Sequence, residues 1–361
     1  MNNLFLELIK TALWKTPIEI DKITNSPIDW SKLVSLAQSQ CVLSLLYDAI
    51  FELPKEIQPQ NDILLTWRFA SVMVEERNRF HNSQIVRLFS IFKEIDLNPI
   101  LLKGQGVARY YPAPLHRQYG DIDIFINEAD IDKAVEALKS HGYLPKGGKS
   151  SKDIIFNIDK IPVEIHFHSI IFYSSRNQKI WEDFHEKYLT NSDNYFELND
   201  YPIRVPSANY NALYLFLHSF KHLLSSEEIT IKQLSDVFLV LSKTANEYDK
   251  DLLILMIKRL RLSKAFYSFI DLGVTYLGFS ADIIEVPTKY NKSSKKILKW
   301  ILHDKNQKSQ KKPQNYLSVR IVTFCKEIKH RIIFFSLSPI ETISYPFWIL
   351  RRLPHHIFRK K

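Results

Sequence analysis

Two aspartates separated by one residue are the feature of this sequence that most directly suggests chemistry. Asp121 and Asp123 lie in DIDIFI, whose alternation of polar and apolar residues predicts a β-strand. Residues two apart on a strand project from one face, so both carboxylates would share a cavity while Ile122 and Ile124 point into the core. Such like charges need a nearby cation, and oxygen ligands favour Mg²⁺ or Mn²⁺. The pair therefore predicts a divalent-metal site, although D-x-D is also a common surface pattern.

A third carboxylate follows in a second predicted strand, PVEIHFH, where Glu164 and His166 share one face. The preceding strand KDIIFNI is separated from it by Asp159 and Lys160, which predicts a β-hairpin. This hairpin would place Glu164 beside the aspartate pair, and three carboxylates on adjacent strands make a two-metal site. The alternatives are an exposed strand residue for Glu164 and a hydrogen-bonded core histidine for His166 or His168, and for the histidines we favour the core interpretation.

A glycine turn before the aspartates suggests phosphate binding. Gly104 ends the predicted strand NPILLKG and begins a predicted helix, so the backbone N–H groups of Gly104 and Gln105 could hold phosphate oxygens. Lys103 and Arg117 would add positive charge. Each cation has an ordinary alternative, because Lys103 could be solvated and Arg117 could pair with Asp121. The order of glycine turn, basic residue, D-x-D strand and carboxylate strand is more informative than any one residue.

The fuller string LLKGxxxAxxYPxPxxRxxGDID resembles a bacterial family of uncharacterised nucleotidyltransferases within the DNA polymerase beta superfamily, often linked with polysaccharide gene clusters. The resemblance covers about residues 80 to 240. It implies that Asp121 and Asp123 bind the metals, that Glu164 binds the catalytic metal, and that Gly104 with Lys103 binds the triphosphate.

The resemblance extends to HSFKHLLSSEEITIKQLSD, which is similar to the family's later His-rich helix and following aspartate. The residues that this implies for substrate binding are His218, Lys221, His222 and Asp236. His166, on the strand of Glu164, is a further candidate for substrate binding. For His218 and His222, four apart on a helix, a polar surface or interdomain face is an equal alternative. The sequence departs from the superfamily at Gln105, where serine is usual, and at Glu164, where aspartate is more frequent.

The expected function is transfer of a nucleoside monophosphate from a nucleoside triphosphate to an unknown acceptor hydroxyl, with Mg²⁺ or Mn²⁺ as cofactor. Two rival functions stay open. One is a catalytically degenerate nucleotide-binding or scaffold protein, and the other is an RNA-modifying toxin of the same fold. Residues 96 to 240 show no basic clustering, which disfavours a large nucleic-acid footprint on the catalytic face.

The residues that position these groups predict an α+β fold. Residues 1 to 95 carry apolar residues at helical spacing and form an N-terminal helical region. Residues 96 to 205 contain the predicted strands and form a small mixed β-sheet nucleotidyltransferase core. Residues 206 to 288 return to helical spacing and are expected to pack on that core. Residues 289 to 361 are expected to be a basic linker, to about residue 312, followed by an aromatic and basic C-terminal segment.

Composition sets broader limits. The 361 residues are 45% apolar and 13% aromatic, enough for a sizeable core. Cys41 and Cys325 lie far apart, which excludes a disulfide framework and favours a reducing, cytoplasmic setting. The N-terminal lysines follow the apolar stretch, so no signal peptide is expected. The net charge of +10 is unevenly distributed, because residues 289 to 361 contain 18 Lys and Arg against three acidic residues.

The basic C-terminal segment could lie peripherally on the inner membrane surface. A transmembrane helix is not expected, because charged residues and prolines interrupt every long apolar run. Aromatic side chains would enter the headgroup region and basic ones would meet anionic lipid. The residues concerned are Phe334, Phe335, Phe347, Trp348, Arg351, Arg352, Arg359, Lys360 and Lys361. The alternative, which we favour, is that the apolar part packs on the helical domain.

Overall fold

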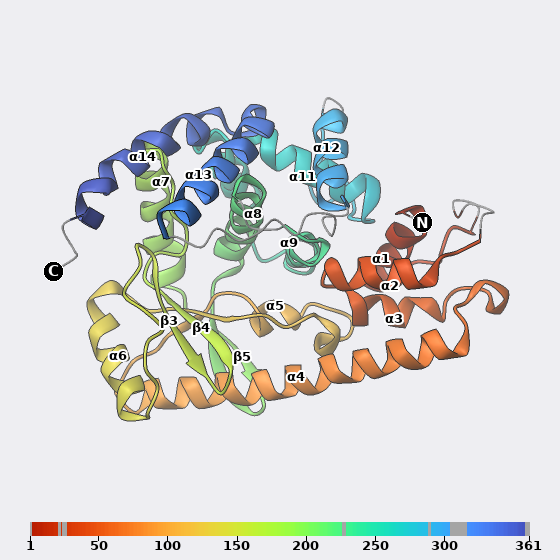
Figure 1. Cartoon of the computed structure of the whole chain (residues 1–361), viewed down its shortest axis with the longest axis horizontal. Coiled ribbons are helices and arrows are strands. Elements are labelled where there is room, and N and C mark those ends of the chain that lie inside the picture. Colours follow the sequence, from red (N-terminus) through yellow and green to blue (C-terminus); the bar gives the residue numbers. More distant parts are fainter. Residues whose placement is uncertain are drawn as a thin grey trace.

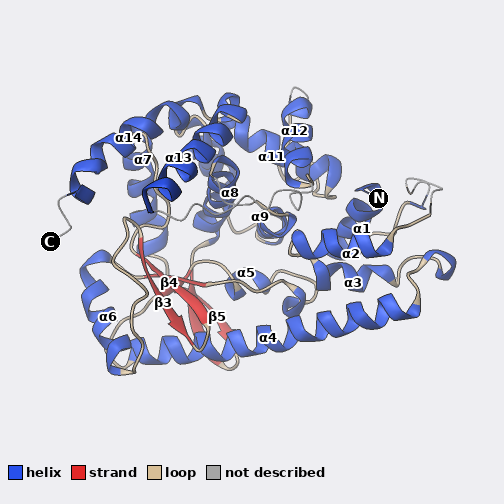
Figure 2. Ribbon diagram, viewed as in Figure 1, coloured by secondary structure: helices blue, strands red, loops and turns tan. Residues whose placement is uncertain are grey.

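The computed structural model describes residues 2–20, 23, 27–225, 229–287, 290–303 and 316–357, without the side chains of 316–321 and 352–357. Small β-sheets are embedded among many helices, so the predicted α+β fold is confirmed (Figures 1 and 2). Within the described residues, no helix is both long enough and apolar enough to cross a membrane.

The N-terminal region is helical, as predicted: α1 Asn2–Trp14, α2 Trp30–Ser39, α3 Leu43–Ile50, a short 3-10 turn η2 Lys55–Ile57, and α4 Asn61–Lys93. Asp29 caps the N-terminus of α2, because its side chain accepts a hydrogen bond from the Lys32 N–H at 2.9 Å. Helix α4 is a single long helix that extends along one long edge of the molecule (Figure 1). Its first half buries Trp67 with the N-terminal helices, and its second half buries Phe89 and Phe92 in the core beside the sheet.

The main sheet has the strand order β1-β2-β4-β3, with β1 Ile100–Leu101, β2 Ile122–Phe125, β3 Asp153–Ile158 and β4 Ile161–His166. The β3–β4 hairpin turns through Asp159 and Lys160, both with positive φ, as the sequence predicted. Strand β2 is parallel to β4 and antiparallel to β1, so the sheet is mixed. The parallel connection passes through helix α6 Ile131–Ser140. In this register Asp123 lies opposite Glu164.

Several shorter elements complete the core. A second hairpin, β5 Asn194–Leu198 and β6 Tyr201–Val205, was not predicted and turns through Asn199 and Asp200, both with positive φ. The remaining elements are α5 Gln105–Ala108, η3 Pro114–His116, η4 Glu128–Asp130, α7 Ser175–His185 and the π-helical turn η5 Glu186–Thr190.

The helices after the core are α8 Ala208–Leu224, α9 Ile231–Lys243, α10 Lys250–Arg259 and α11 Ser263–Tyr276. Side chains of Ser207 and Asp249 cap α8 and α10, and a capping box from Thr230 and Gln233 begins α9. Helix α8 is buried along most of its length and packs against α9. These two helices therefore form the wall that faces the sheet.

The prediction of a linker from 289 to about 312 is wrong in its first half. Residues Asn291–Ile301 form helix α12, which packs on α11. Its buried Ile297, Leu298 and Ile301 follow helical spacing, but the surrounding lysines and serines concealed this pattern in the composition. Residue 289 and residues 304 to 312 of the predicted linker lie outside the described residues.

The C-terminal segment forms α13 Tyr316–Ile333, the turn η7 Phe335–Leu337 and α14 Pro339–Ile357. Part of it packs inward, because the buried Glu341 carboxylate accepts hydrogen bonds from Tyr173 N at 2.8 Å and Asn177 Nδ2 at 3.1 Å. Phe334 is 1% exposed and meets the ring of Trp300 edge-on, so its predicted membrane contact is wrong. The predicted basic residues Arg352, Arg359, Lys360 and Lys361 have side chains outside the described part.

Candidate active site

A polar cavity of about 120 Å³ lies where the sheet meets α8 and α9. The core contributes the turn after β1, the loop before β2 and the first residues of β2, and the two helices close the other side. The residues that line it are Lys103, Gly104, Arg117, Gly120, Asp121, Asp123, Leu215, His218, Ser219, His222, Lys232, Gln233 and Asp236.

Three carboxylates, Asp121, Asp123 and Glu164, form what we call the carboxylate trio. Asp121 directly precedes β2 and is exposed, whereas Asp123 within β2 is 2% exposed. Between them Ile122 is buried in the sheet core, as the alternation predicted. Glu164 lies beside Asp123 because β2 and β4 are adjacent and in register. Side chains from two segments about forty residues apart thus converge on one face of the sheet.

His166 adds a nitrogen to this group. Its Nε2 lies 2.9 Å from Asp123 Oδ1 and 3.3 Å from Glu164 Oε2. One ligand atom from each of Asp123, Glu164 and His166 lies within 4.8 Å of the other two, a spacing that could hold a metal ion. The geometry also agrees with the hydrogen-bonded core histidine favoured from the sequence, since His166 is 4% exposed.

The Lys103 ammonium is the cation nearest the carboxylates. Its Nζ lies 2.8 Å from Asp123 Oδ1 and donates to His218 Nε2 at 2.8 Å. Burial by itself would raise the pKa of Asp123, but Lys103 and the hydrogen bond from His166 lower it well below its usual range. The charge of Asp123, together with burial, raises the pKa of Asp121. Lys103 therefore satisfies Asp123 and leaves Asp121 in an excess of negative charge.

Two neutral histidines on α8 form the facing wall. Burial and the nearby Lys103 charge lower the pKa of His218 well below its usual value, and the same two causes lower that of His222 to about 4. Their ring centroids are 4.5 Å apart. Both imidazoles are uncharged at neutral pH, so they can accept or donate hydrogen bonds in the cavity without adding positive charge.

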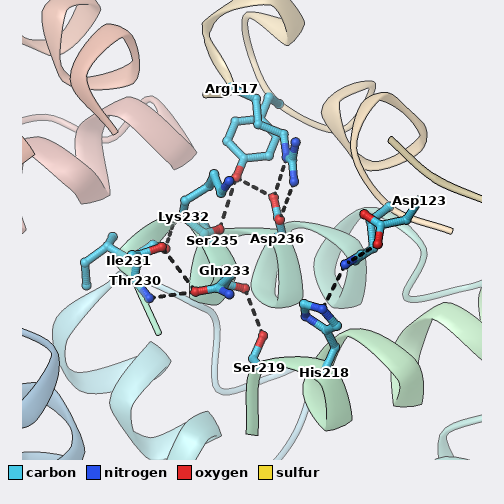
Figure 3. Close-up of polar contacts among 12 residues, drawn as sticks. Arg117, Asp123, His218, Ser219, Thr230, Ile231, Lys232, Gln233, Ser235 and Asp236 are labelled. Atoms are coloured by element: carbon cyan, nitrogen blue, oxygen red, sulfur yellow. Dashed lines mark hydrogen bonds and ion pairs between the residues drawn. The ribbon is translucent and has the colours of Figure 1, made fainter. Parts of the chain in front are cut away.

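Arg117 and Asp236 form a buried two-bond ion pair between the core and α9 (Figure 3). Arg117 Nε and Nη2 donate to the two Asp236 oxygens at 2.8 and 2.7 Å, and Tyr111 Oη donates to Asp236 Oδ1 at 2.7 Å. Although burial opposes it, Asp236 raises the pKa of Arg117 above its usual value. Arg117 lines the cavity, but its partner is Asp236 and not the Asp121 considered from the sequence.

Two predicted site residues point elsewhere. Lys221 lies on the other side of α8, 3.4 Å from Glu341 Oε2 and over the ring of Tyr173, where burial lowers its pKa to about 8 although Glu341 opposes this. Gln105 is buried, and its Nε2 donates to Asn78 Oδ1 at 3.1 Å. Gly104, by contrast, is at the cavity with φ +60, a conformation that glycine adopts without strain.

The sequence analysis missed other residues near the site. Lys232 and Gln233 line the cavity from the first turn of α9, and Lys152 Nζ lies 3.9 Å from Glu164 Oε2. One signal was available for Lys232, because it precedes Asp236 by four residues and so shares its helix face. No comparable local signal pointed to Lys152.

The chain is similar in sequence to a nucleotidyltransferase family. A family model described as "Uncharacterised nucleotidyltransferase" matches residues 26–278, which include the carboxylate trio and both helices of the cavity wall. Among solved structures, the chain is similar to an antigenic nucleotidyltransferase-like protein from Paracoccidioides brasiliensis. The identity is 10% and the TM-score 0.35, with 56% of this chain and 95% of that chain covered. No curated protein matches.

Proposed function

Because the chain belongs to the uncharacterised nucleotidyltransferase family, we propose that it transfers a nucleoside monophosphate from a nucleoside triphosphate to an acceptor hydroxyl, with Mg²⁺ or Mn²⁺. The observation that carries this proposal is the convergence of Asp121, Asp123 and Glu164 on one face of the sheet, with the two aspartates lining the polar cavity. The family resemblance suggests an acceptor from polysaccharide metabolism.

The donor set fits a divalent cation. The trio supplies carboxylate oxygens, which Mg²⁺ and Mn²⁺ prefer, and His166 lies close enough to Asp123 to orient it or to serve as a further ligand. The raised pKa of Asp121 supports the fit, because the charge of Asp123 repels a second negative charge that a bound cation would accommodate. Such an ion would supply activation of the acceptor hydroxyl and neutralisation of phosphate charge.

The protein's own side chains would arrange the reactants. Lys103 holds the Asp123 carboxylate in place and keeps it ionised, since it lies 2.8 Å from Oδ1. The neutral His218 accepts the other Lys103 contact and borders the same cavity. The Arg117–Asp236 pair fixes α9 against the core, so that the wall opposite the trio stays at a constant distance.

The test is an assay with each of the four labelled ribonucleoside triphosphates, Mg²⁺ or Mn²⁺, and an extract of the native host as the source of acceptor. We expect one nucleotide to label a component of the extract only when the metal is present. The Asp123→Asn variant is the control for contaminating activity. Labelling that is equal for wild type and variant, or independent of metal, would refute the proposal.

One difference from the usual superfamily sequence supports a second candidate, a non-catalytic protein of the same fold. Gln105 stands where the superfamily usually has a phosphate-binding serine, and its side chain contacts Asn78. A degenerate nucleotide-binding protein would bind a triphosphate with metal and show no turnover with any extract. Binding without label transfer in the assay above would favour that alternative.

We also propose peripheral contact of α14 with an anionic membrane. Ile343, Phe347 and Leu350 are 56 to 60% exposed and follow helical spacing along one face, beside the exposed Arg351. The test is flotation with anionic liposomes of wild type and of a Phe347→Glu, Leu350→Glu variant, with Leu255→Glu on the exposed face of α10 as control. Equal flotation of all three proteins, or none, would refute the proposal.

A further inference from the structure

Three basic side chains line the cavity within the described residues, and two of them are already paired. Lys103 contacts Asp123 and His218 at 2.8 Å each. Arg117 donates to both oxygens of Asp236. A cation that is held by protein carboxylates is a poor partner for a substrate anion, because binding the anion would first require that pair to separate.

Lys232 is the third. It projects from the first turn of α9 beside the loop before β2, where its Nζ lies 3.9 Å from the position that a Cβ on Gly120 would occupy. Across the described ranges, its ammonium makes no hydrogen bond or ion pair; the contact from Tyr111 is to the Lys232 carbonyl oxygen. Burial and the charge of Arg117 lower its pKa. A partly buried ammonium without a partner is unfavourable, so an anion would stabilise it.

The backbone at the start of α9 is not available for this role. The side chains of Thr230 and Gln233 form a capping box, and Gln40 Oε1 accepts from Ile231 N at 3.1 Å. The Gln40 carbonyl oxygen accepts from Lys232 N at 3.3 Å. The N-terminal N–H groups of this helix are thus occupied, and its contribution to an anion would come from the Lys232 side chain.

We propose that Lys232 binds the terminal phosphates of the triphosphate substrate, so that the helical wall supplies the cation for the polyphosphate tail. This inference rests on the proposed function and assigns to α9 a role that the sequence had given to Lys103. The tail would pass Gly120, where the missing side chain leaves the path from Asp121 to Lys232 open. The carboxylates then face the reacting phosphate and Lys232 faces the leaving pyrophosphate.

In this arrangement the Arg117–Asp236 pair positions Lys232 relative to the carboxylates. Asp236 lies one helical turn beyond Lys232 on the same face of α9, and Arg117 belongs to the loop that leads to Asp121 (Figure 3). The pair therefore holds the polyphosphate cation and the carboxylates at a fixed separation. We regard Arg117 and Asp236 as positioning residues and Lys232 as the group that touches the substrate.

The test measures binding calorimetrically, with Mn²⁺ present, for inorganic tripolyphosphate and for the nucleoside tri- and monophosphates. Tripolyphosphate serves as a probe that does not depend on the base. Lys232→Met should weaken tripolyphosphate and triphosphate binding by about 10- to 100-fold, the scale of a charge-assisted contact, and alter monophosphate binding by less than about threefold. Lys232→Arg should recover part of the loss. Lys243→Met, at the exposed last turn of the same helix, is the matched control and should bind like wild type.

The outcomes separate this inference from the function on which it rests. If wild type and Lys232→Met bind tripolyphosphate equally, Lys232 is not the phosphate cation and the nucleotidyltransferase proposal stands. If wild type binds neither tripolyphosphate nor any triphosphate, both proposals fail. If Lys232→Met and Lys243→Met lose binding together, the effect belongs to α9 as a whole and the assignment to Lys232 is refuted. Thermal unfolding of each variant identifies any loss of fold, in which case Lys232→Arg decides.

Discussion

Two groups of charged side chains border the same cavity and differ in their charge balance. In the Arg117–Asp236 pair, one guanidinium meets one carboxylate through two hydrogen bonds of 2.7 and 2.8 Å. In the carboxylate trio, three acids share one close ammonium from Lys103, with Lys152 farther from Glu164 at 3.9 Å. The pair is buried, whereas Asp121 of the trio is exposed; the charge of Asp123 raises the pKa of Asp121, so the surplus negative charge of the trio lies there. The balanced pair holds two parts of the fold together, whereas the surplus marks a position for a cation that the protein does not itself supply.

The largest expected effect comes from neutralising either aspartate of the trio. Asp121→Asn and Asp123→Asn should each reduce nucleotidyl transfer by about 100-fold or more, because each removes a metal ligand. Their effects on stability should have opposite signs. Lys103 stabilises the Asp123 charge, so Asp123→Asn should lower the melting temperature, whereas Asp121→Asn relieves repulsion from Asp123 and should raise it.

Label transfer and thermal unfolding at neutral pH measure both parts of this prediction. Normal turnover in both variants would show that the metal assignment is wrong. A fall in melting temperature for both would show that the surplus charge is already compensated, which would remove the contrast with the Arg117–Asp236 pair.

Breaking the Arg117–Asp236 pair should act mainly on the stability of the fold. Asp236→Asn leaves the buried Arg117 guanidinium without its charged partner and should lower the free energy of unfolding by about 3 to 5 kcal/mol. Urea denaturation gives this value, and Asp251→Asn, at an exposed position in the first turn of α10, is the control with no large effect. Unchanged stability of Asp236→Asn would contradict the structural role of the pair.

A smaller catalytic effect is expected at Glu164, the member of the trio on β4. Glu164→Gln should reduce kcat by about 10- to 100-fold while nucleotide affinity changes by less than about twofold, since the aspartates and Lys232 remain. Steady-state kinetics together with direct binding separate the two quantities. Equal losses in kcat and affinity would indicate that Glu164 supports the cavity generally and does not act on the chemical step.

Local periodicity explains which parts of the site the sequence predicted. The alternation in DIDIFI predicted the shared face of Asp121 and Asp123, and the predicted hairpin through Asp159 and Lys160 is present. Glu164 lies beside Asp123 because β4 pairs in parallel with β2. The strand faces and the turn were local inferences, whereas the parallel pairing of β2 with β4 depends on the connection through α6. The linker prediction failed at α12 because a composition rich in lysine conceals a short run of apolar residues at helical spacing.

Partners distant in sequence could not be predicted in this way. Arg117 and Asp236 are 119 residues apart, and nothing local distinguishes their contact from the Arg117–Asp121 alternative. Neighbours on a helix also diverge: Lys221 and His222 differ by one residue, or about 100° around α8, so His222 borders the cavity while Lys221 contacts Glu341. Which residues meet across such sequence separations, and which partner each side of α8 contacts, depends on how the helices pack in the assembled fold.

The smallest expected effect tests the charge-balance argument away from the cavity. His116 Nδ1 lies 2.7 Å from Asp48 Oδ2 and its Nε2 lies 3.0 Å from Glu75 Oε1, a surplus of acid by simple count. Arg68 and Arg79, each 3.9 Å from Glu75, restore the balance, so this cluster should act structurally.

The hydrogen bond with Asp48 and the contact with Glu75 raise the pKa of His116, although burial opposes them. Because the folded pKa exceeds the unfolded value of about 6.5, the stabilisation is fully present below that value and is lost as the pH rises through the folded pKa. Unfolding of wild type at about pH 5 and about pH 8 should therefore differ by about 1 kcal/mol more than that of His116→Gln, while His141→Gln, at a more exposed histidine, should behave like wild type. Loss of transfer activity in His116→Gln, with stability unchanged at both pH values, would show that a balanced cluster can serve function and would remove the basis for distinguishing the two groups at the cavity.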